Sequence, residues 1–523
     1  MDATASDARR DDDGSPGADG SPDAREAGQA DAGHDGAAAR DAAADADASD
    51  PPDPPGPLAA DYVDYDINHV LETGQSNAVA SGARPENTFT AGTAFTSAQP
   101  YTNLMFDTGV MTAGPKPGIT SGCNGSGCPA SVYRAPAAFL PLIENDSFFG
   151  GGDRVETASS SMANEISSLA LEQLLFGVKA GYPTKHDVLV SQHGRSGNTY
   201  WCLRKGGCNY KPASEIPAFD EAIKQVQAGQ ALAVAAGKSY VVRAVTTIHG
   251  ESDHYSYQDG GVEFPLAGTN GVPNRIKDYD DALIEWQEDY ESMVKGITGQ
   301  AQPVPLFVSG LSGWTGTQLA HRTSKLAALQ LTAHERAPGK VVLVTPGYIF
   351  DAGIQSNGQL ECLHYSLLGQ QHLGEYFAKA YAQVVLRGKP FEPVRPLAVS
   401  RVANVITVKF LVPAPPLVFD TVRVNPVGIA NYGFDILDTG TLVAVTSVAL
   451  TGPDTVTITL AANPSAGPKR LRYALNQPIP GCIGPGVLTE GGARGNLRDS
   501  DPTPSKKGFS LFNWSVAFDV AVP

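Results

Sequence analysis

Five short apolar segments alternate with five amphipathic segments between residues 62 and 390, and this alternation constrains the fold more than any other feature of the sequence. The apolar segments are rich in β-branched residues and lack a sustained polar alternation, as is typical of strands buried in a parallel sheet. They span residues 67–71, 187–191, 240–248, 304–308 and 341–345. The helical patterns between them span residues 161–179, 216–236, 276–297, 318–336 and 366–386. Strands that are each followed by a helix predict a three-layer α/β/α domain with a five-stranded parallel sheet, over residues 61–392.

Two regions depart from this alternation. Residues 78–160 are rich in Gly, Pro, Ser and Thr, and we expect them to form a wall of a cleft after the first strand. Beyond Pro393 the helical period disappears, and short strand patterns are separated by Pro, Gly and Asp turns. These patterns span residues 402–410, 421–425, 442–450 and 455–460. They predict a β-sandwich accessory domain over residues 393–523.

The first 60 residues form a separate acidic segment. They contain 15 Asp or Glu and four Arg, and Ala, Gly and Pro fill most of the rest. So few bulky apolar side chains cannot offset the entropy of ordering, which predicts a disordered tail. Without the tail's net charge of −11, the total of −17 leaves −6 for the rest of the chain. This balance argues against nucleic acid as a partner.

The cysteines bear on the compartment. No stretch approaches the roughly 20 apolar residues of a membrane-spanning helix, and the N-terminus lacks the basic and apolar regions of a signal peptide. However, Cys123 with Cys128 and Cys202 with Cys208 form close pairs that suit disulfides in an oxidising compartment. A secreted or cell-surface bacterial protein, tethered like a lipoprotein and with its signal absent from this chain, reconciles these observations. Six unrelated thiols are the alternative.

Ser76 is the candidate nucleophile. It lies in the tetrapeptide GQSN at residues 74–77, directly after the first predicted strand, and ligands bind at the C-terminal ends of strands in an open α/β sheet. A serine nucleophile needs a base, a carboxylate that orients the base and donors for the oxyanion. His364 follows the last predicted strand in what we expect to be a loop, and Glu361, three residues earlier, can reach its Nδ1. We expect neither a metal nor another cofactor.

Two more polar, glycine-containing segments follow predicted strands, at residues 193–201 and 249–253. Together with GQSN and Glu-x-x-His they resemble the blocks of the SGNH hydrolase superfamily, in particular carbohydrate O-acetylesterases of the sialate O-acetylesterase type. The resemblance covers about residues 62–390. It implies a flavodoxin-like α/β/α domain that hydrolyses an ester through an acyl-enzyme.

The resemblance implies a role for each matching residue. Ser76 corresponds to the nucleophile, His364 to the general base, and Glu361 to the orienting acid, where the family usually has Asp. The backbone N–H groups of Ser76 and Gly194 correspond to the oxyanion hole. His249 occupies the place of a Gln or Asn of the family, where a neutral imidazole can donate one hydrogen bond.

Other residues of these blocks are expected to support the site. Glu251 corresponds to a residue that holds the Ser76 turn, as do Gln75 and Asn77. Arg195 and Trp201 are candidates for substrate contact.

The C-terminal domain adds two features. A bond between Cys362 and Cys482 would attach the domain beside the active site, whereas two independent thiols are the alternative. The glycine-rich segment 491–499 carries Arg494 and Arg498, which could contact acidic or hydroxylated sugars by bidentate hydrogen bonds. A turn at the domain interface is an equally compatible interpretation.

The preferred function is therefore a secreted esterase, taken as a monomer, that removes acetyl or other short acyl groups from a carbohydrate. Its expected partner is an acetylated glycan or another small ester. The alternatives are a lipid or aryl ester hydrolase on the same fold and a non-catalytic carbohydrate-binding surface protein.

Overall fold

The protein was analysed as a computed structural model that describes residues 57–81, 83–85, 93–96, 100–111, 135–144, 146–147, 154–207, 216–258, 264–312, 324–354, 360–424, 426, 429–475, 493–508 and 510–523. Residues 1–52 and 53–523 form separate units. Most of the predicted tail lies outside the described residues. Its last part does not, because Leu58 packs against the core and the Ala59 N–H donates to the Leu386 carbonyl at 2.8 Å. The α/β part therefore begins before the predicted boundary at residue 61.

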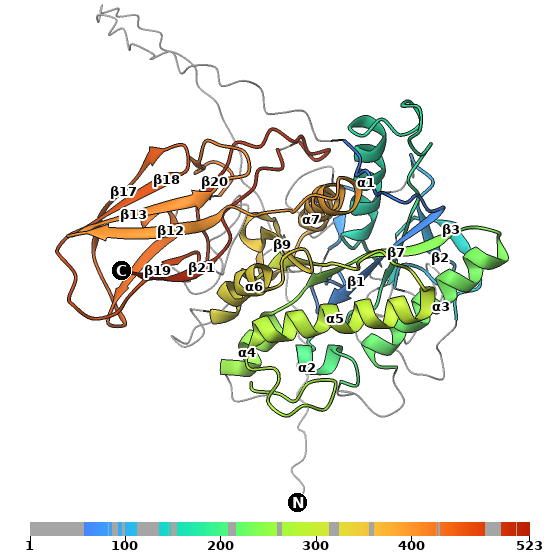
Figure 1. Cartoon of the computed structure of the whole chain (residues 1–523), viewed down its shortest axis with the longest axis horizontal. Helices are drawn as coiled ribbons and strands as arrows, with labels where there is room; N and C mark the ends of the chain where they lie inside the picture. Colours follow the sequence, from blue (N-terminus) through green and yellow to red (C-terminus); the bar gives the residue numbers. More distant parts are fainter. Residues whose placement is uncertain are drawn as a thin grey trace, which may run out of the picture. The chain divides into compact units, whose positions relative to one another are not determined.

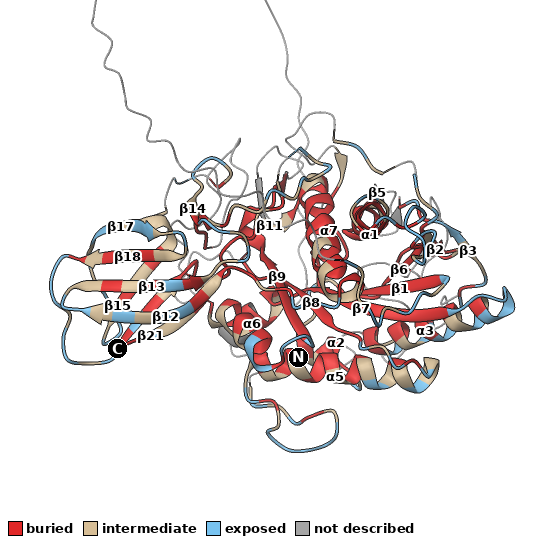
Figure 2. Ribbon diagram, turned by 45° about the horizontal axis from the view of Figure 1, so that its top comes forward, coloured by how far each residue is buried: buried red, intermediate tan, exposed pale blue. Residues whose placement is uncertain are grey.

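A seven-stranded, mostly parallel sheet forms the centre of the α/β part, in the order β3-β2-β6-β1-β7-β8-β9. The five predicted strands all run parallel in this sheet, and all of their residues are buried (Figure 2). They are β1 (Ile67–Gly74), β6 (Val188–Gln192), β7 (Tyr240–Ile248), β8 (Leu306–Gly310) and β9 (Val341–Pro346). Numbered along the chain, their order is 2-1-3-4-5, so the strand order reverses beside β1.

The segment predicted as an irregular wall contributes two strands to this sheet. β2 (Leu104–Phe106) pairs parallel with β6, and β3 (Phe139–Pro141) pairs antiparallel with β2. Another short pair joins β4 (Asp146–Ser147) and β5 (Arg154–Val155). Strands of two or three residues have too short a pattern to stand out in a Gly- and Pro-rich sequence, which is why they were not predicted.

Helices cover both faces of the sheet (Figure 1). One face carries α1 (Ser159–Glu172) and α7 (Leu367–Tyr381). The other carries α3 (Ala218–Ala235), α5 (Tyr279–Thr298) and α6 (Lys325–Arg336). Two shorter helices, α2 (Tyr200–Leu203) and α4 (Glu251–Gln258), lie at the ends of β6 and β7. Among the described helices, none has the length and apolar character needed to cross a membrane.

The sequence of α5 explains both its limits and its position. The Asp278 side chain accepts a hydrogen bond from the Tyr279 N–H and caps the first turn, and Gly299 ends the helix with a φ of 68°. An aromatic stripe at helical spacing, which includes Trp286 and Tyr290, is fully buried. It packs on the core, as expected from its helical spacing.

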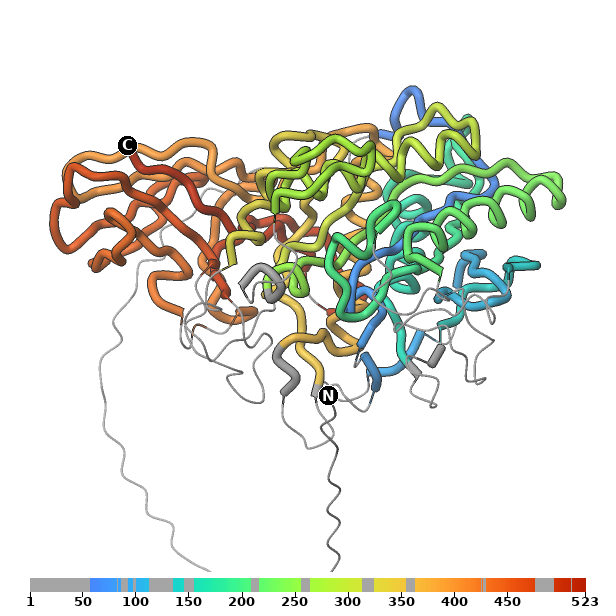
Figure 3. The backbone as a smooth tube through the Cα atoms, turned by 90° about the horizontal axis from the view of Figure 1, so that it is seen from below, coloured from blue at the N-terminus to red at the C-terminus, as the bar shows by residue number. Residues whose placement is uncertain are grey.

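The C-terminal part consists of antiparallel sheets, whose strands run from orange to red in Figure 3. One sheet has the order β12-β13-β18-β17, another β16-β15-β19-β21, and β14 pairs with β20. Their bounds are β12 (Arg395–Val402), β13 (Val405–Leu411), β14 (Val418–Phe419), β15 (Phe434–Asp438), β16 (Thr441–Leu442), β17 (Val445–Gly452), β18 (Thr455–Leu460), β19 (Lys469–Tyr473), β20 (Leu497–Arg498) and β21 (Phe518–Val522). The Phe410 ring of β13 lies 6.5 Å from Phe434 of β15 and 6.1 Å from Phe518 of β21, so aromatic packing joins the two four-stranded sheets.

The predicted C-terminal strands are only partly correct. The pattern at 455–460 coincides with β18, and those at 402–410 and 442–450 overlap β13 and β17. Residues 421–424 form a turn instead of the predicted strand, in which the Asp420 carboxylate accepts hydrogen bonds from the backbone of Val422 and Arg423. A side chain that caps its own turn competes with strand pairing, and the sequence pattern does not register that competition.

Candidate active site

Three neighbouring parallel strands, β6, β1 and β7, end at the same edge of the sheet. Gly74 at the end of β1 pairs with Ile248 at the end of β7, and Glu72 pairs with Gln192 at the end of β6. The segments that follow β6, β1 and β7 carry Gly194, Ser76 and Glu251, respectively. This is the point at which the strand order reverses, where open α/β sheets bind their ligands.

The Ser76 turn is held against the end of β7. Gly74 has a φ of +131°, and a Cβ at this position would lie 2.2 Å from the Ile248 carbonyl oxygen, so only glycine fits. The next N–H, of Gln75, donates to that same carbonyl at 3.2 Å, and the Gln75 side chain accepts from the Ser252 N–H at 2.9 Å. Ser76 therefore occupies a tight turn, and 6% of its surface is exposed.

Asn77 joins the Ser76 turn to the segment that carries His364. Its Nδ2 donates to the Leu363 carbonyl at 3.1 Å, and its Oδ1 accepts from the Tyr365 N–H at 3.0 Å. The same Nδ2 donates to the Glu251 carboxylate at 3.2 Å. The backbone on both sides of His364 is thus bonded to the residue next to Ser76, and the Asn77 side chain is fully buried. We call this arrangement the Asn77 clamp.

His364 lies on a strand rather than in the predicted loop. Residues 360–365 form β11 (Leu360–Tyr365), which pairs antiparallel with β10 (Ala352–Ile354). β11 runs into α7, whose first turn is capped by the Ser366 hydroxyl, the acceptor of the Gly369 N–H at 3.1 Å. Glu361 belongs to the same strand, opposite Gly353, but its side chain lies outside the described residues. Its orienting role remains a prediction.

Glu251 lies between the Ser76 turn and His364. Its carboxylate is buried and accepts the Asn77 bond, and burial raises its pKa although the nearby His364 acts in the opposite direction. Among the described residues, Glu251 Oε2 has no hydrogen-bond partner. These contacts support the predicted role of Glu251 in holding the Ser76 turn, as the Gln75 and Asn77 bonds do for those two residues.

Gly194 lies close to the Ser76 turn. A Cβ on Gly194 would approach the Gly74 carbonyl oxygen to 2.5 Å, and the next N–H, of Arg195, donates to that oxygen at 2.9 Å. Within the described part of the chain, neither the Gly194 N–H nor the Ser76 N–H donates a hydrogen bond to another residue. Their role as oxyanion donors stays a prediction.

His249 does not fit the predicted oxyanion role. Its Nδ1 lies 2.7 Å from the Tyr279 hydroxyl, and its Nε2 lies 3.3 Å from the Asn198 carbonyl and 3.2 Å from the Asp253 carboxylate. Burial lowers its pKa to about 4, so the ring is neutral and has a single N–H to donate. Both ring nitrogens are thus engaged inside the protein. We revise His249 to a residue that joins the end of β7 to the loop after β6.

Arg195 also faces inward. Its guanidinium donates to the His193 and Gly194 carbonyls at 3.0 and 2.9 Å and forms an ion pair with Glu221 of α3. Its side chain is 8% exposed. We therefore revise the expected substrate contact to a structural role in shaping the Gly194 loop.

Trp201 lies on α2, close to these residues in the chain, and is partly buried. The Arg204 guanidinium lies 4.2 Å from the centre of its ring. The preceding residue, Tyr200, donates its backbone N–H to Asp253 at 2.9 Å, which ties α2 to the end of β7. Substrate contact by Trp201 remains a prediction.

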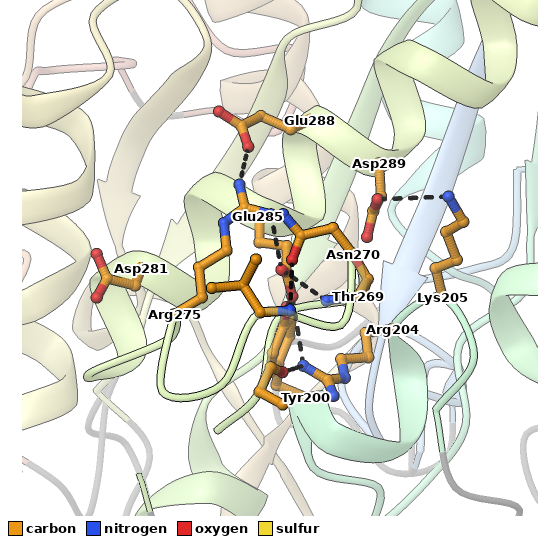
Figure 4. Close-up of polar contacts among 12 residues, drawn as sticks. Tyr200, Arg204, Lys205, Thr269, Asn270, Arg275, Asp281, Glu285, Glu288 and Asp289 are labelled. Carbon is orange, nitrogen blue, oxygen red and sulfur yellow. Dashed lines mark hydrogen bonds and ion pairs between the residues drawn. The ribbon is translucent and has the colours of Figure 1, made fainter. Parts of the chain in front are cut away.

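A polar network that the sequence did not indicate fixes α2 in place (Figure 4). Its centre is Glu285 of α5, a buried carboxylate that accepts from the Tyr200 hydroxyl at 2.7 Å, Arg204 at 3.3 Å and Arg275 at 3.1 Å. The Thr269 N–H donates to it as well, at 2.9 Å. The helical spacing of the aromatic residues around Trp286 is typical of core packing. A single Glu among them, Glu285, gives no sign in the sequence that four distant groups donate hydrogen bonds to it.

Both arginines of the C-terminal segment are structural. Arg498 donates to the Asp420 carboxylate at 2.7 Å and to the Asp499 carbonyl at 2.7 Å, and its guanidinium lies 3.6 Å from the centre of the Phe512 ring. Arg494 is buried, with 2% of its surface exposed. The predicted contact of these residues with sugars is therefore not retained.

The cysteine predictions are tested at one position. Cys202 forms a disulfide, and the described residues include no free cysteine. Its predicted partner Cys208 lies outside the described residues, as do Cys123, Cys128, Cys482 and the Cys362 side chain. The described residues also contain no group of three His, Cys, Asp or Glu side chains arranged to hold a metal ion.

Comparison with known proteins gives distant structural likenesses. No protein-family model and no curated protein sequence matches the chain. A carbohydrate acetylesterase from Xanthomonas citri is 12% identical, with a TM-score of 0.44, over 87% of this chain and 80% of that protein. A carbohydrate acetylesterase from Sinorhizobium meliloti is 11% identical, with a TM-score of 0.26, over 60% of this chain and 98% of that protein. Likenesses this distant do not assign an activity.

Proposed function

We propose that this protein is a serine esterase of the SGNH type that removes acetyl or other short acyl groups from a carbohydrate. The Asn77 clamp carries this proposal. Because the residue after Ser76 is bonded to the residues on both sides of His364, a serine and an imidazole belong to adjoining segments. A hydroxyl beside an imidazole is the pair that nucleophilic acyl transfer requires.

In the proposed reaction, Ser76 Oγ attacks the acyl carbonyl and His364 accepts its proton. The N–H groups of Ser76 and Gly194 stabilise the oxyanion, and this proposal draws support from their lack of acceptors among the described residues. His364 then returns the proton to the departing alcohol, leaving an acyl group on Ser76. Water hydrolyses the acyl-enzyme by the same steps, with Glu361 proposed to orient the imidazole.

The carbohydrate part of the proposal comes from the motif resemblance. Trp201 adds an aromatic surface on α2, close to the Gly194 loop, and such a surface suits the apolar faces of sugar rings. The disulfide at Cys202 fits the proposed secretion, since disulfides persist in oxidising compartments.

Acetate release from a panel of acetylated polysaccharides tests the proposal, with p-nitrophenyl acetate as a general ester. Ser76→Ala removes the nucleophile, so kcat should fall by about 10⁴-fold or more on every substrate. Circular dichroism of the variant controls for folding. Activity of Ser76→Ala equal to that of the wild type would refute the proposed mechanism.

A fluorophosphonate probe separates the alternatives. A serine esterase forms a covalent adduct at Ser76 that peptide mapping locates, whereas a non-catalytic carbohydrate-binding protein gives none. Preference for long-chain over acetyl esters in the same assays would favour the lipid esterase alternative.

A further inference from the structure

The helix that follows His364 is held by the C-terminal part along one of its faces. Four residues of α7 share that face, because they are spaced three or four positions apart. They are His372, Glu375, Tyr376 and Lys379. Since α7 begins three residues after His364, whatever holds this helix also limits where β11 can lie.

Three of these residues contact the segment 501–513. Glu375 accepts hydrogen bonds from the Ser505 hydroxyl and from the Lys506 N–H, the latter at 3.0 Å. The Tyr376 hydroxyl donates to the Phe512 carbonyl at 2.9 Å. Lys379 donates to Asn513 at 2.8 Å and forms an ion pair with Asp501 at 2.8 Å.

The fourth residue, His372, meets Arg423 from the turn after β14. The Arg423 guanidinium donates to His372 Nδ1 at 3.2 Å and to the Ile349 carbonyl at 3.3 Å. Burial, together with the Arg423 charge, holds the pKa of His372 well below its usual value, so the ring is neutral and Nδ1 accepts. Arg423 thus contacts both α7 and the chain that leads from β9 into the β10–β11 hairpin.

The contacts continue from His372 to the Ser76 turn. The His372 ring lies 5.3 Å from Phe350, and Phe350 lies 5.4 Å from Tyr365. The Tyr365 N–H is in turn a donor to the Asn77 clamp. A continuous set of packed rings and hydrogen bonds therefore joins Arg423 of the C-terminal part to the residue beside Ser76.

The Arg423 charge is also held close to the start of the hairpin. Burial lowers the pKa of Arg423, and the nearby Asp351 acts against this effect. The Asp351 carbonyl accepts the Ser366 N–H at 2.8 Å, which connects the entry of β10 to the exit of β11. Removing the guanidinium would leave Asp351 and the Ile349 carbonyl without their cationic neighbour.

We propose that Arg423 is a positioning residue, through which the C-terminal β part sets the location of the hairpin that carries His364. This inference rests on the proposed esterase function. Arg423 acts on the hairpin through His372, Phe350 and Tyr365. The C-terminal part is then an integral element of the active site rather than a detachable module.

Replacing Arg423 by Met tests the proposal, because Met keeps much of the side-chain length and removes the charge. We expect kcat on p-nitrophenyl acetate to fall about 10- to 100-fold with little change in KM, since a displaced base slows chemistry more than binding. Arg423→Lys keeps a cationic donor and should recover part of kcat. Hydrogen exchange should rise in peptides covering residues 349–366 of the Met variant.

Arg472→Met provides the matched control. Arg472 lies on β19, is 12% exposed in its side chain and pairs with Asp435 of β15 at 3.7 Å, within the C-terminal sheet. Its loss should lower stability without changing kcat or the exchange of residues 349–366. An equal fall of kcat in Arg472→Met and Arg423→Met, or wild-type kcat and exchange in Arg423→Met, would overturn the positioning role.

The exchange measurement keeps this proposal distinct from the esterase proposal. If the wild-type protein neither turns over esters nor reacts with a fluorophosphonate, the esterase function fails. Increased exchange of the hairpin in Arg423→Met would still support the mechanical link. Unchanged exchange would overturn that link whatever the activity.

Discussion

Asp253, which follows β7, and Asp420 of the C-terminal part are carboxylates whose pKa values are shifted in opposite directions. Asp253 accepts a hydrogen bond from the Tyr200 N–H and lies 3.2 Å from Nε2 of the neutral His249 ring, and burial raises its pKa to about 7. Asp420 is also partly buried, which by itself would raise its pKa, but the hydrogen bonds from the Arg423 backbone and from Arg498 outweigh burial and lower it.

This difference in pKa shift distinguishes residues of the candidate active site from residues that stabilise the fold. The end of β7 holds Glu251 and Asp253 without an ion pair to Lys or Arg in the described part of the chain, which is costly for stability. Asp420 instead forms an ion pair with Arg498 at 2.7 Å. Polar groups that are buried and left without a counter-ion are where chemistry is expected, whereas balanced ones hold the fold together.

Asn77→Ala is the strongest test of the role of the Asn77 clamp in the candidate active site. The substitution removes the bonds to Leu363 and Tyr365, so we expect kcat on p-nitrophenyl acetate to fall about 100-fold through misplacement of His364. The matched control is Asn103→Ala, since Asn103 is equally buried but accepts hydrogen bonds from Ser167 of α1 and from Val188 at the start of β6. Equal activity losses in the two variants would show that the clamp has no special role.

Arg498→Met tests the structural role of Arg498 in the C-terminal part. Loss of its bonds to Asp420 and Asp499 should lower the free energy of unfolding by about 2 kcal/mol, as for hydrogen bonds of charged groups. KM for the ester should not change. Urea unfolding and steady-state kinetics measure these quantities.

Arg470→Met is the control for Arg498→Met, because its ion pair with Asp519 is at the surface, with 47% of the arginine side chain exposed. It should change stability by no more than about 0.5 kcal/mol. A higher KM in Arg498→Met would instead show that Arg498 contributes to substrate binding.

Asp253→Asn should act through the pH dependence of stability rather than through activity. The folded state keeps the Asp253 proton up to about pH 7, whereas the unfolded chain releases it near 3.8. The contribution of this group is therefore complete below about pH 4 and is lost as the pH rises to 7. The variant should lose less stability over that window, by up to about 1.4 kcal/mol per pH unit. If the free energies of unfolding of the two proteins, measured in urea, change equally between pH 4 and pH 8, this assignment is wrong.

Much of the α/β part followed from local pattern. The segments at 67–71 and 240–248 are buried on both faces, and strands of that kind are rich in apolar and β-branched residues. The GQSN turn could be located for the same reason, since it ends such a strand. The edge strand β2 could not, because three residues in a Gly- and Pro-rich segment carry no period.

The fate of individual polar residues was less predictable. His249 and Arg498 each matched a functional pattern, but their partners Tyr279 and Asp420 lie 30 and 78 residues away in the chain. A sequence motif reports the type of group at a position. The motif does not show whether the donors and acceptors of that group already form hydrogen bonds with another part of the chain.

For this protein, the order of apolar and polar segments was enough to determine the parallel sheet and the edge at which Ser76, Gly194 and Glu251 gather, because strand periodicity and the direction of parallel strands are local properties. Only the tertiary structure decided that Asn77 bonds both neighbours of His364 and that Arg423 of the C-terminal part supports the hairpin. Those contacts join residues that are remote in the chain, and they form only when packing brings their donors and acceptors within hydrogen-bonding distance.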